Sequence, residues 1–331
     1  MSKTLILGGA GFIGGHLARA LVESGGSVDV VDNFSRGVRD PFLRDLDAKP
    51  NVRLIDADVL GETLGSRLAD DYSIIYQLAA IIGVRHVLER PYEVLRDNVA
   101  IQARAIELGR KQKALLRFVF ASTSEVYAGS LLHTNMPIPT PEAVPLALTD
   151  LAQPRTSYLL SKIYGEALCH QSGLSFTIVR PHNLYGPRMG LAHVLPELML
   201  KARGLPVGGT LGVASPGHRR TFCYIDDAVE MIRRLAAAPA AAHGTFNVGN
   251  QDQEVSIGEV ARLVVQTLGR SDVEILPLPD TPGSPTRRCP DMKWTVGVTG
   301  FRATVALEDG IRRTYRWYDE NVFASGGVSA T

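Results

Sequence analysis

Tyr158 and Lys162 form a Tyr-x-x-x-Lys pair near the start of a predicted helix over residues 156–171. Their spacing places both side chains on one face of that helix. A phenol has a pKa of about 10, and a nearby ammonium group favours the ionised phenolate. The pair could therefore remove a proton from a bound hydroxyl near neutral pH. The alternative interpretation is a solvated helix surface, where tyrosine and lysine often meet at this spacing.

Hydroxyl-bearing residues follow an apolar run at 118–121, in the sequence Ser122-Thr123-Ser124-Glu125. At the carboxyl end of a strand, such hydroxyls could hydrogen-bond a substrate oxygen and share a proton with a tyrosine. Glu125 adds a candidate acid or base. The alternative interpretation is a Ser/Thr-rich turn that caps the next segment.

Closely spaced glycines mark the first turn of the chain, in the segment Leu-Ile-Leu-Gly-Gly-Ala-Gly-Phe-Ile-Gly. An apolar run, a tight turn and an amphipathic run from Phe12 predict a strand, a turn and a helix start. Glycines let backbone N–H groups at the helix N-terminus approach a pyrophosphate, where the helix dipole favours negative charge. Two spacings fit equally well, G-x-G-x-x-G from Gly9 and G-x-x-G-x-x-G from Gly8, and both include Gly11 and Gly14.

A carboxylate ends the second apolar run, at 27–32. Asp32 lies about 20 residues beyond the glycines, where a dinucleotide site needs an acid for the adenosine ribose hydroxyls. Because a carboxylate repels a 2′-phosphate, the sequence favours NAD over NADP. Arg36 weakens that preference, since a guanidinium can pair with a 2′-phosphate.

The composition excludes several classes of function. The 331 residues include 35 basic and 34 acidic side chains, for a formal net charge of +1, so no basic excess points to nucleic acid or an anionic membrane. The three cysteines are far apart in sequence, which fits a reducing compartment. No Cys/His cluster has metal-ligand spacing, and no apolar stretch is long enough to span a bilayer. We expect a cytoplasmic protein without a metal site.

Strand-like and helix-like runs alternate through the first 180 residues. The strands are expected at 4–7, 28–31, 52–55, 74–78, 118–121 and 176–179, and the clearest helices at 12–24, 91–111 and 156–171. This alternation of apolar strands with helices predicts an α/β fold with a Rossmann-type doubly wound parallel sheet. In such a sheet, ligands bind beyond the carboxyl ends of the strands, where the motifs above lie.

Beyond residue 180, prolines and glycines become frequent. The pattern predicts helices at 194–203, 226–236, 256–268 and 307–318, a strand at 245–248, a Pro-rich loop at 278–290 and a loose tail at 324–331. We expect residues 1–180 to bind the dinucleotide, completed by segments near 219–249. Residues 181–331 should mainly form a smaller mixed α/β portion that holds the substrate.

Together, the motifs resemble the extended short-chain dehydrogenase/reductases that modify nucleotide sugars, the NAD-dependent epimerase/dehydratase group. The resemblance runs from residue 3 to residue 318 and rests on the order in which the motifs occur. They are the glycine turn, Asp32, Asp58-Val59, Leu78-Ala79-Ala80, Asn98, Ser122-Thr123-Ser124, Tyr158 with Lys162, and Arg180-Pro181-His182-Asn183.

The resemblance implies NAD as the cofactor, a nucleotide-diphosphate sugar as the substrate and a homodimer paired through the helices near 91–111 and 156–171. It makes Tyr158 the catalytic base, Lys162 its partner, Thr123 the catalytic hydroxyl and Glu125 a further catalytic residue. The implied NAD contacts are Gly8, Gly11, Phe12, Ile13, Gly14, Asp32, Asn33, Asp58, Val59, Leu78, Ala79, Ala80, Asn98, Ser122, Tyr158, Lys162 and Pro181. The expected substrate contacts are Arg85, Thr123, Asn183, Arg188, Arg220 and Arg288.

The implied first step is removal of the 4-hydroxyl proton of the sugar by Tyr158, while the C4 hydride moves to NAD. The resulting 4-keto sugar has three outcomes. Return of the hydride to the other face gives the C4 epimer. A C6 carboxylate is then part of a β-keto acid and can leave as carbon dioxide, whereas a C6 hydroxyl can be eliminated as water.

Glu125 should choose among these outcomes, and the motifs around it are ambiguous. Thr-Ser-Glu resembles nucleotide-sugar decarboxylases and one branch of the 4,6-dehydratases, while Ser124 replaces the aspartate of the other dehydratases. His-Asn-x-Tyr-Gly-Pro-Arg-Met resembles 4-epimerases. We expect a 4-epimerase, because it needs only the shared hydride machinery and free rotation of the sugar. The alternatives are a UDP-glucuronate-type decarboxylase or a 4,6-dehydratase. A dehydrogenase that releases NADH is a further alternative, which the sequence favours less.

Overall fold

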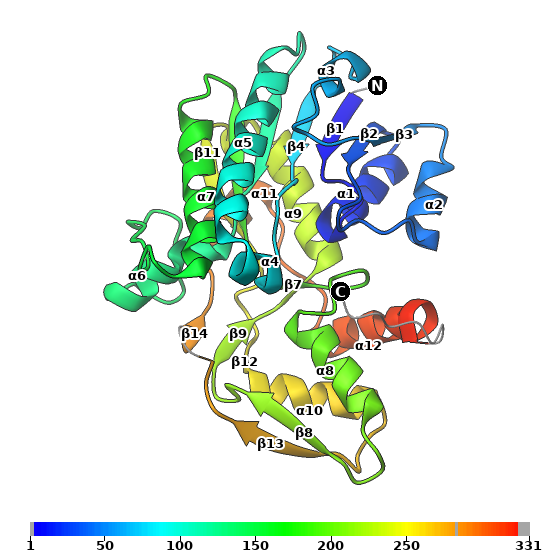
Figure 1. Ribbon diagram of the computed structural model, residues 1–331, viewed down its shortest axis with the longest axis vertical. Helices are drawn as coiled ribbons and strands as arrows, with labels where there is room; N and C mark the ends of the chain where they lie inside the picture. Colours follow the sequence, from blue (N-terminus) through cyan, green and yellow to red (C-terminus); the bar gives the residue numbers. More distant parts are fainter. Residues whose placement is uncertain (1–2, 282–283, 324–331) are drawn as a thin grey trace.

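A seven-stranded sheet forms the centre of the molecule, and every neighbouring pair of its strands is parallel (Figure 1). The computed structural model describes residues 3–281 and 284–323. The strand order is β11-β6-β5-β4-β1-β2-β3, so the direction of winding reverses at β1. The strands are β1 (Lys3–Leu7), β2 (Ser27–Asp32), β3 (Val52–Asp56), β4 (Ile74–Gln77), β5 (Arg117–Ala121), β6 (Phe176–Pro181) and β11 (Gly244–Val248).

Helices connect these strands and extend into the second half of the chain. The α-helices are α1 (Phe12–Glu23), α2 (Pro41–Asp47), α3 (Leu64–Arg67), α4 (Val84–Glu89), α5 (Pro91–Arg110), α6 (Ala128–His133), α7 (Pro154–His170), α8 (Val194–Gly204), α9 (Ile225–Ala237), α10 (Ile257–Thr267), α11 (Lys293–Thr299) and α12 (Leu307–Tyr318). Short turns of other helix types are η1 (Ser124–Tyr127), η2 (Pro239–Ala241) and η3 (Asp319–Phe323). A capping box begins α10, because Ser256 and Glu259 each accept the backbone N–H of the other.

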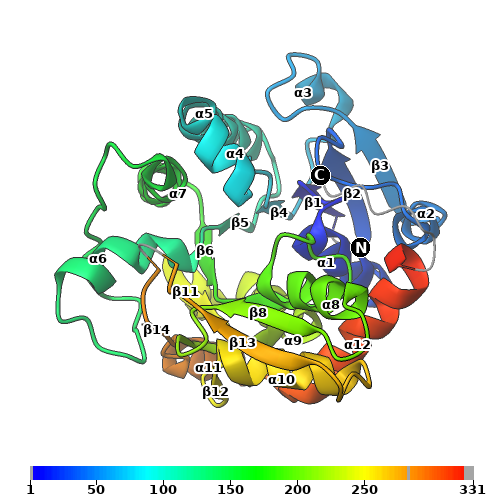
Figure 2. The same cartoon turned by 60° about the horizontal axis from the view of Figure 1, so that its bottom comes forward.

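Both faces of the sheet are buried, which explains why its strands are continuous apolar runs. In β1, Leu5 and Leu7 belong to a cluster that includes residues of α5 and α7. Ile6, between them, belongs to a second cluster that includes residues of α1 and α9. Figure 2 shows the two pairs of helices on opposite sides of the sheet.

The second half of the chain builds three small sheets beyond the carboxyl ends of the main strands (Figure 1). One pairs β7 with β10, one pairs β8 with β13, and in the third β9 lies between β12 and β14. In the last sheet, Arg288 is opposite Arg220. The strands are β7 (Leu184–Tyr185), β8 (Thr210–Ala214), β9 (Arg219–Thr221), β10 (Cys223–Tyr224), β12 (Glu254–Ser256), β13 (Glu274–Leu278) and β14 (Arg287–Arg288).

The predicted Rossmann-type fold is confirmed, and each predicted strand and helix lies within two residues of an observed one. The segment at 245–248 is the seventh strand of the main sheet, paired with β6. The predicted loop at 278–290 contains β14. The short strands of the second half and α2, α3, α4, α6 and α11 were not predicted. The predicted tail at 324–331 lies outside the described residues.

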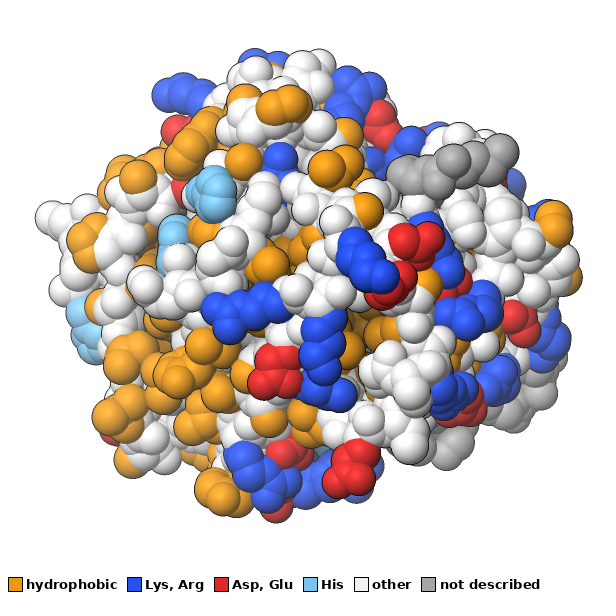
Figure 3. All heavy atoms as spheres, turned by 90° about the horizontal axis from the view of Figure 1, so that it is seen from above, with side chains coloured by type: hydrophobic (Ala, Val, Ile, Leu, Met, Phe, Trp, Pro, Cys, Tyr) orange, Lys and Arg blue, Asp and Glu red, His pale blue; other side chains and the backbone are white. Residues whose placement is uncertain are grey.

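Within the described chain, no helix combines the length and the apolar character needed to cross a bilayer. On the face seen in Figure 3, basic and acidic side chains are interspersed. The three cysteines are buried and unpaired.

Candidate active site

The glycine turn between β1 and α1 is so tight that a side chain at Gly8 or Gly14 would collide with the backbone. Gly8 has φ +82°, and a Cβ there would lie 2.6 Å from the backbone nitrogen of Ala79. A Cβ on Gly14 would lie 2.5 Å from the carbonyl oxygen of Gly8. No side chain caps α1, so the N–H groups of Phe12 and Ile13 are available to an anion.

The same contacts show what each glycine of the two spacings does. A Cβ on Gly9 would meet the Val30 side chain at 2.6 Å, so Gly9 is required for packing against β2. Around Gly11, by contrast, the nearest atom to a Cβ would be 3.5 Å away. Since Gly8, Gly9 and Gly14 are all tightly enclosed, the open side of the turn lies at Gly11, which both spacings share.

Asp32 lies at the end of β2, beside the glycine turn. Its carboxylate accepts the N–H groups of Ala10 and Phe34, each at 2.9 Å. Burial raises the pKa of Asp32, and these two hydrogen bonds act to lower it. Asn33 donates to the carboxylate of Asp58 at 2.7 Å, and this places the two polar residues expected at the adenosine end side by side.

Val59, next to Asp58, is buried. On the other side of β1, the segment Leu78-Ala79-Ala80 follows β4, and Ala79 forms the wall that Gly8 approaches. Asn98 is buried on α5 and both donates to and accepts from the backbone of Ile81. Asn98 therefore positions the loop after β4.

Tyr158, Thr123 and Lys162 lie together where β5 meets α7. Tyr158 hydrogen-bonds Thr123, and the Lys162 ammonium lies 5.8 Å from the centre of the Tyr158 ring. Lys162 donates to the carbonyl of Ala121 at 2.8 Å. Burial lowers the pKa of Lys162 to about 8, although the charge of Glu166 acts to raise it.

The phenol itself is protonated in this environment. Burial raises the pKa of Tyr158, and the charge of Glu125 adds to that effect. The Thr123 hydrogen bond and the Arg36 guanidinium act to lower it. A cationic ligand beside the ring would favour the phenolate. Tyr158 should therefore act as a base only when such a ligand is bound.

Glu125 forms an ion pair with Arg288, 163 positions away in the sequence. Both terminal nitrogens of the guanidinium face the carboxylate, the second at 3.3 Å. Burial would raise the pKa of Glu125, but the charges of Arg288, Arg155 and Arg220 outweigh it and lower the pKa. Among the described residues, nothing accepts the buried Nε–H of Arg288.

Arg220 and Asn183 border this pair. Arg220 donates to the carbonyl of Pro285 at 2.7 Å and to the Ser284 hydroxyl at 3.1 Å. Burial and the charge of Arg288 lower the pKa of Arg220 to about 10. Asn183 donates to the carbonyl of Thr221 at 2.9 Å. The structure thus brings three predicted substrate residues and Glu125 to one region.

Ser122 is engaged in a buried polar network behind the site. It donates to Glu166 at 2.5 Å, and Glu166 pairs with Arg180 at 2.6 Å. The network continues through Tyr127 to Asn247. Pro181, at the end of β6, pairs in register with Val248. These contacts fix the ends of β5 and β6 beside α7, the helix that carries Tyr158 and Lys162.

Two expected substrate arginines are placed elsewhere. Arg188 is buried, and its guanidinium pairs with Asp40 at 2.6 Å and donates to the carbonyls of Ala10 and Gly11. Because its donors are engaged, Arg188 braces the glycine turn and is not available to a substrate. Arg85 is exposed on α4 and pairs with Glu89 at 3.0 Å, the geometry of a solvated helix surface.

Several residues of the site were missed in the sequence. Arg155 lies one helical turn before Tyr158 and acts electrostatically on Glu125, and its i, i+3 spacing was a readable signal. Gln77 fixes the backbone of Ala79 through two hydrogen bonds. It ends a strand, yet no pattern marks it.

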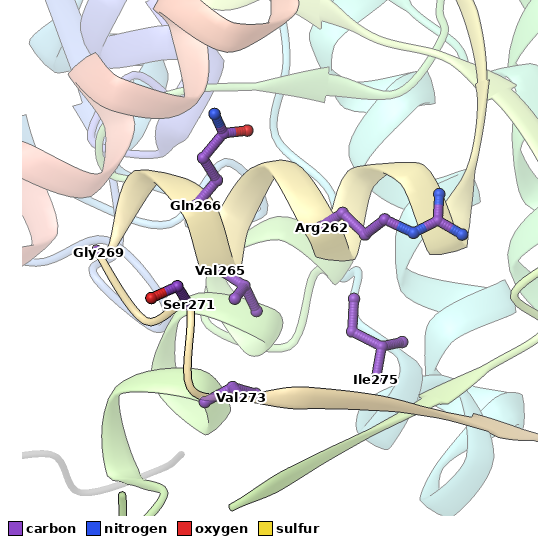
Figure 4. Close-up of a pocket in the computed structure, with 7 residues that line it drawn as sticks. All are labelled: Arg262, Val265, Gln266, Gly269, Ser271, Val273 and Ile275. Carbon is purple, nitrogen blue, oxygen red and sulfur yellow. The ribbon is translucent and has the colours of Figure 1, made fainter. Parts of the chain in front are cut away.

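A hollow of about 270 Å³ lies apart from these residues, between α10 and β13 (Figure 4). None of the candidate site residues borders it, and we assign it no role. Its lining is Arg262, Val265, Gln266, Gly269, Ser271, Val273 and Ile275.

Known proteins resemble the chain along nearly its whole length. The profile of the NAD dependent epimerase/dehydratase family matches residues 4–249. A UDP-N-acetyl-alpha-D-glucosaminuronate decarboxylase from Bacillus cytotoxicus is 32% identical over 332 residues, covering 96% of this chain and 98% of that protein. UDP-glucuronic acid decarboxylase 1 from Xenopus tropicalis is 31% identical, covering 96% of this chain and 72% of that protein.

A solved structure shares the fold. The UDP-glucuronic acid 4-epimerase from Bacillus cereus, in complex with UDP-glucuronic acid and NAD, has a TM-score of 0.81 and 25% identity, and the match covers 96% of this chain and 99% of that one. The glycine turn and Asp32 fit the same cofactor here. The chain thus belongs to the NAD-dependent epimerase/dehydratase family and is an NAD-dependent enzyme that modifies nucleotide sugars.

Proposed function

We propose that the enzyme decarboxylates a nucleoside-diphosphate hexuronic acid through a 4-keto intermediate. One observation carries this proposal. Arg288 pairs with Glu125, whose charge acts on Tyr158, and the buried Nε–H of Arg288 has no acceptor among the described residues. A carboxylate at C6 of the sugar would supply that acceptor and a counter-charge. The decarboxylases that resemble the chain along its length support the same choice.

The first step uses the residues around Tyr158. Bound NAD supplies reversible uptake of the C4 hydride, and its cationic nicotinamide favours the phenolate. Tyr158 then takes the proton of the 4-hydroxyl, Thr123 hydrogen-bonds the same oxygen, and Lys162 adds a positive charge. The Thr123 hydroxyl also accepts the N–H of Glu125 at 3.2 Å, which ties this step to the ion pair.

The second step depends on the C4 ketone. The bond between C5 and the C6 carboxylate breaks, carbon dioxide leaves, and the bonding electrons move through C5 to the C4 oxygen as an enolate. Thr123 hydrogen-bonds that oxygen, and C5 takes a proton from water. Tyr158 would return its proton to the C4 oxygen as C4 regains its hydride, so the complete cycle releases no NADH.

The low pKa of Glu125 favours decarboxylation over dehydration. A dehydratase needs one group to remove the C5 proton and an acid to protonate the departing hydroxyl. Arg288 keeps the pKa of Glu125 low, so Glu125 is a poor acid at neutral pH. Ser124 stands where a second carboxyl group would be needed. The expected 4-epimerase activity remains a prediction, and the named decarboxylases favour the alternative over it.

The direct test is the product formed from a hexuronic acid. The enzyme would be incubated in D₂O with NAD and with UDP-glucuronic acid or UDP-N-acetylglucosaminuronic acid, and the products followed by NMR. We expect a sugar that is one carbon shorter and carries deuterium at C5, together with carbon dioxide. A C4 epimer that keeps its carboxylate would support the epimerase instead. A 4-keto-6-deoxy sugar from a neutral hexose would support the dehydratase, and steady NADH production a dehydrogenase.

Two neighbouring arginines give a matched pair of variants. Arg288→Met should raise the KM for the hexuronic acid about tenfold to a hundredfold, the effect of losing one charged hydrogen bond to its carboxylate. Arg287→Met should leave it unchanged, because Arg287 pairs with Glu254 on the surface at 2.7 Å. Equal KM values of the two variants would refute the role of Arg288.

We also propose that two copies of the chain pair through the side of the molecule formed by α4, α5 and α7. Large apolar side chains are exposed there, with Tyr92 at 69% and Tyr164 at 50%. Light scattering at micromolar concentration should give twice the chain mass. Tyr164→Glu should give a monomer, and a monomeric unmodified protein would refute this pairing.

A further inference from the structure

Arg36 reaches across the opening of the glycine turn. It lies in the loop that follows β2, and its guanidinium donates to the carbonyl of Ile82, in the loop that follows β4, at 3.0 Å. In the sheet, β2 and β4 are the two neighbours of β1. The hydrogen bond therefore spans the carboxyl end of β1, where the glycine turn begins.

A third loop meets the same guanidinium. A Cβ built on Gly190, in the segment before α8, would lie 3.6 Å from it, and one built on Gly83 would lie 3.7 Å from it. Its charge also acts on His193 at the start of α8 and on Tyr158. The head group of Arg36 thus stands where three loops converge beyond the carboxyl end of β1.

The charge of Arg36 has no counter-charge. Within the described residues, no carboxylate lies within 4.0 Å of it, and a backbone carbonyl is its recorded acceptor. Arg39, on the same loop, contrasts with it by pairing with Asp56 at 2.8 Å. An unpaired guanidinium over a crevice that receives a diphosphate is suited to bind that diphosphate.

We propose that Arg36 binds the diphosphate of NAD from the side opposite the glycine turn and so retains the cofactor between turnovers. The N–H groups of α1 then contact one side of the diphosphate, and the guanidinium contacts the other. This inference rests on NAD dependence and is independent of the reaction on the sugar.

The position of Arg36 also changes its expected role in cofactor choice. The sequence suggested a contact with a 2′-phosphate beside Asp32. The carboxylate of Asp32 faces Ala10 and Phe34, whereas the guanidinium of Arg36 extends past the turn to Ile82. Arg36 should therefore strengthen NAD and NADP equally, because both carry the same diphosphate.

The test is the rate at which NAD leaves the holoenzyme, measured by exchange against fluorescent etheno-NAD without sugar present. Arg36→Ala should release NAD about tenfold to a hundredfold faster, the effect of losing a charged hydrogen bond. Arg36→Gln, which can keep the bond to Ile82 without the charge, should release it faster as well. Arg39→Ala should release it at the unmodified rate, and thermal unfolding should show that all three variants are folded.

The outcomes separate this role from others. Unchanged NAD release in Arg36→Ala would overturn the proposal, even if the KM for the sugar rises. Unmodified release in Arg36→Gln alone would mean that the bond to Ile82, and not the charge, retains the cofactor. Weaker binding of NADP alone would place the guanidinium at the 2′-phosphate. Each of these results is independent of whether the enzyme releases carbon dioxide.

Discussion

Replacing Lys162 by methionine should stabilise the protein while it abolishes turnover. The Lys162 side chain is 5% exposed, and its ammonium has a carbonyl, that of Ala121, as its hydrogen-bond acceptor. Burial lowers its pKa from 10.5 to about 8. That difference in pKa means that the protonated side chain costs the folded state about 3 kcal/mol relative to the unfolded state. Losing the bond to Ala121 offsets about 1 kcal/mol of the gain. Lys162→Met should therefore raise the free energy of unfolding at pH 7 by about 2 kcal/mol.

The pH dependence gives the sign of this effect. At pH 7 the group is protonated in both states, so the folded protein carries the full cost. Between pH 8 and pH 10.5 the unfolded chain still binds a proton that the folded chain has released. Stability therefore rises with pH in this window, by about 2 kcal/mol from pH 7 to pH 10. Lys162→Met should lack this rise.

The assay is urea unfolding followed by circular dichroism at pH 7, 8, 9 and 10, with both proteins freed of nucleotide. Other lysines and tyrosines titrate in this range in both proteins, so the difference between the two curves isolates Lys162. A variant that is less stable at pH 7, or one with the same slope as the unmodified protein, would refute the reasoning. Full activity of Lys162→Met would remove Lys162 from the catalytic group.

Three further changes test the framework of the site. Arg188→Met breaks a buried ion pair that braces the glycine turn, so urea unfolding should show a loss of about 3 kcal/mol, and calorimetry weaker NAD binding. Gly14→Ala should cost about 1–3 kcal/mol and impair NAD binding because its Cβ meets backbone, whereas Gly297→Ala, on an open helix surface, should cost nothing. Glu166→Gln leaves Arg180 buried without its counter-charge, and thermal unfolding should show a loss of about 3–5 kcal/mol. Stability equal to that of the unmodified protein would contradict each.

Local patterns account for most of what the sequence predicted correctly. The glycine turn, the apolar strands and the Tyr158–Lys162 pair are each contained in a short segment, so residue spacing alone indicates the local structure. Among the strands that were missed, β7, β9, β10, β12 and β14 have two or three residues, too few for a periodic pattern to mark them. The other two, β8 and β13, are as long as β1, and both contain exposed residues. The start of α2 was readable, because Asp40 caps it and Pro41 follows, and both are common helix-start residues.

Arg85 and Arg188, which were predicted to contact the substrate, show why a motif alone is a poor guide to the position of a charged side chain. Arg85 has its partner four residues away, so the sequence contained the ion pair with Glu89 that holds it on a solvated helix. Arg188 contacts carbonyls 177 and 178 positions away, and no local pattern could indicate them. A buried guanidinium binds whatever acceptors the fold brings to it, and here these belong to the cofactor turn.

The proposed chemistry at C6 of the sugar depends on a contact of the same long-range kind. Glu125 is fixed at the end of β5, but Arg288 reaches it because β14 pairs with β9, with Arg288 opposite Arg220. Shifting that pairing by one residue would turn Arg288 to the other side of the strand and present Arg287 instead. In the proposed reaction, the hydride step would therefore depend on the main sheet, and the fate of the keto sugar would depend on the register of a two-residue strand.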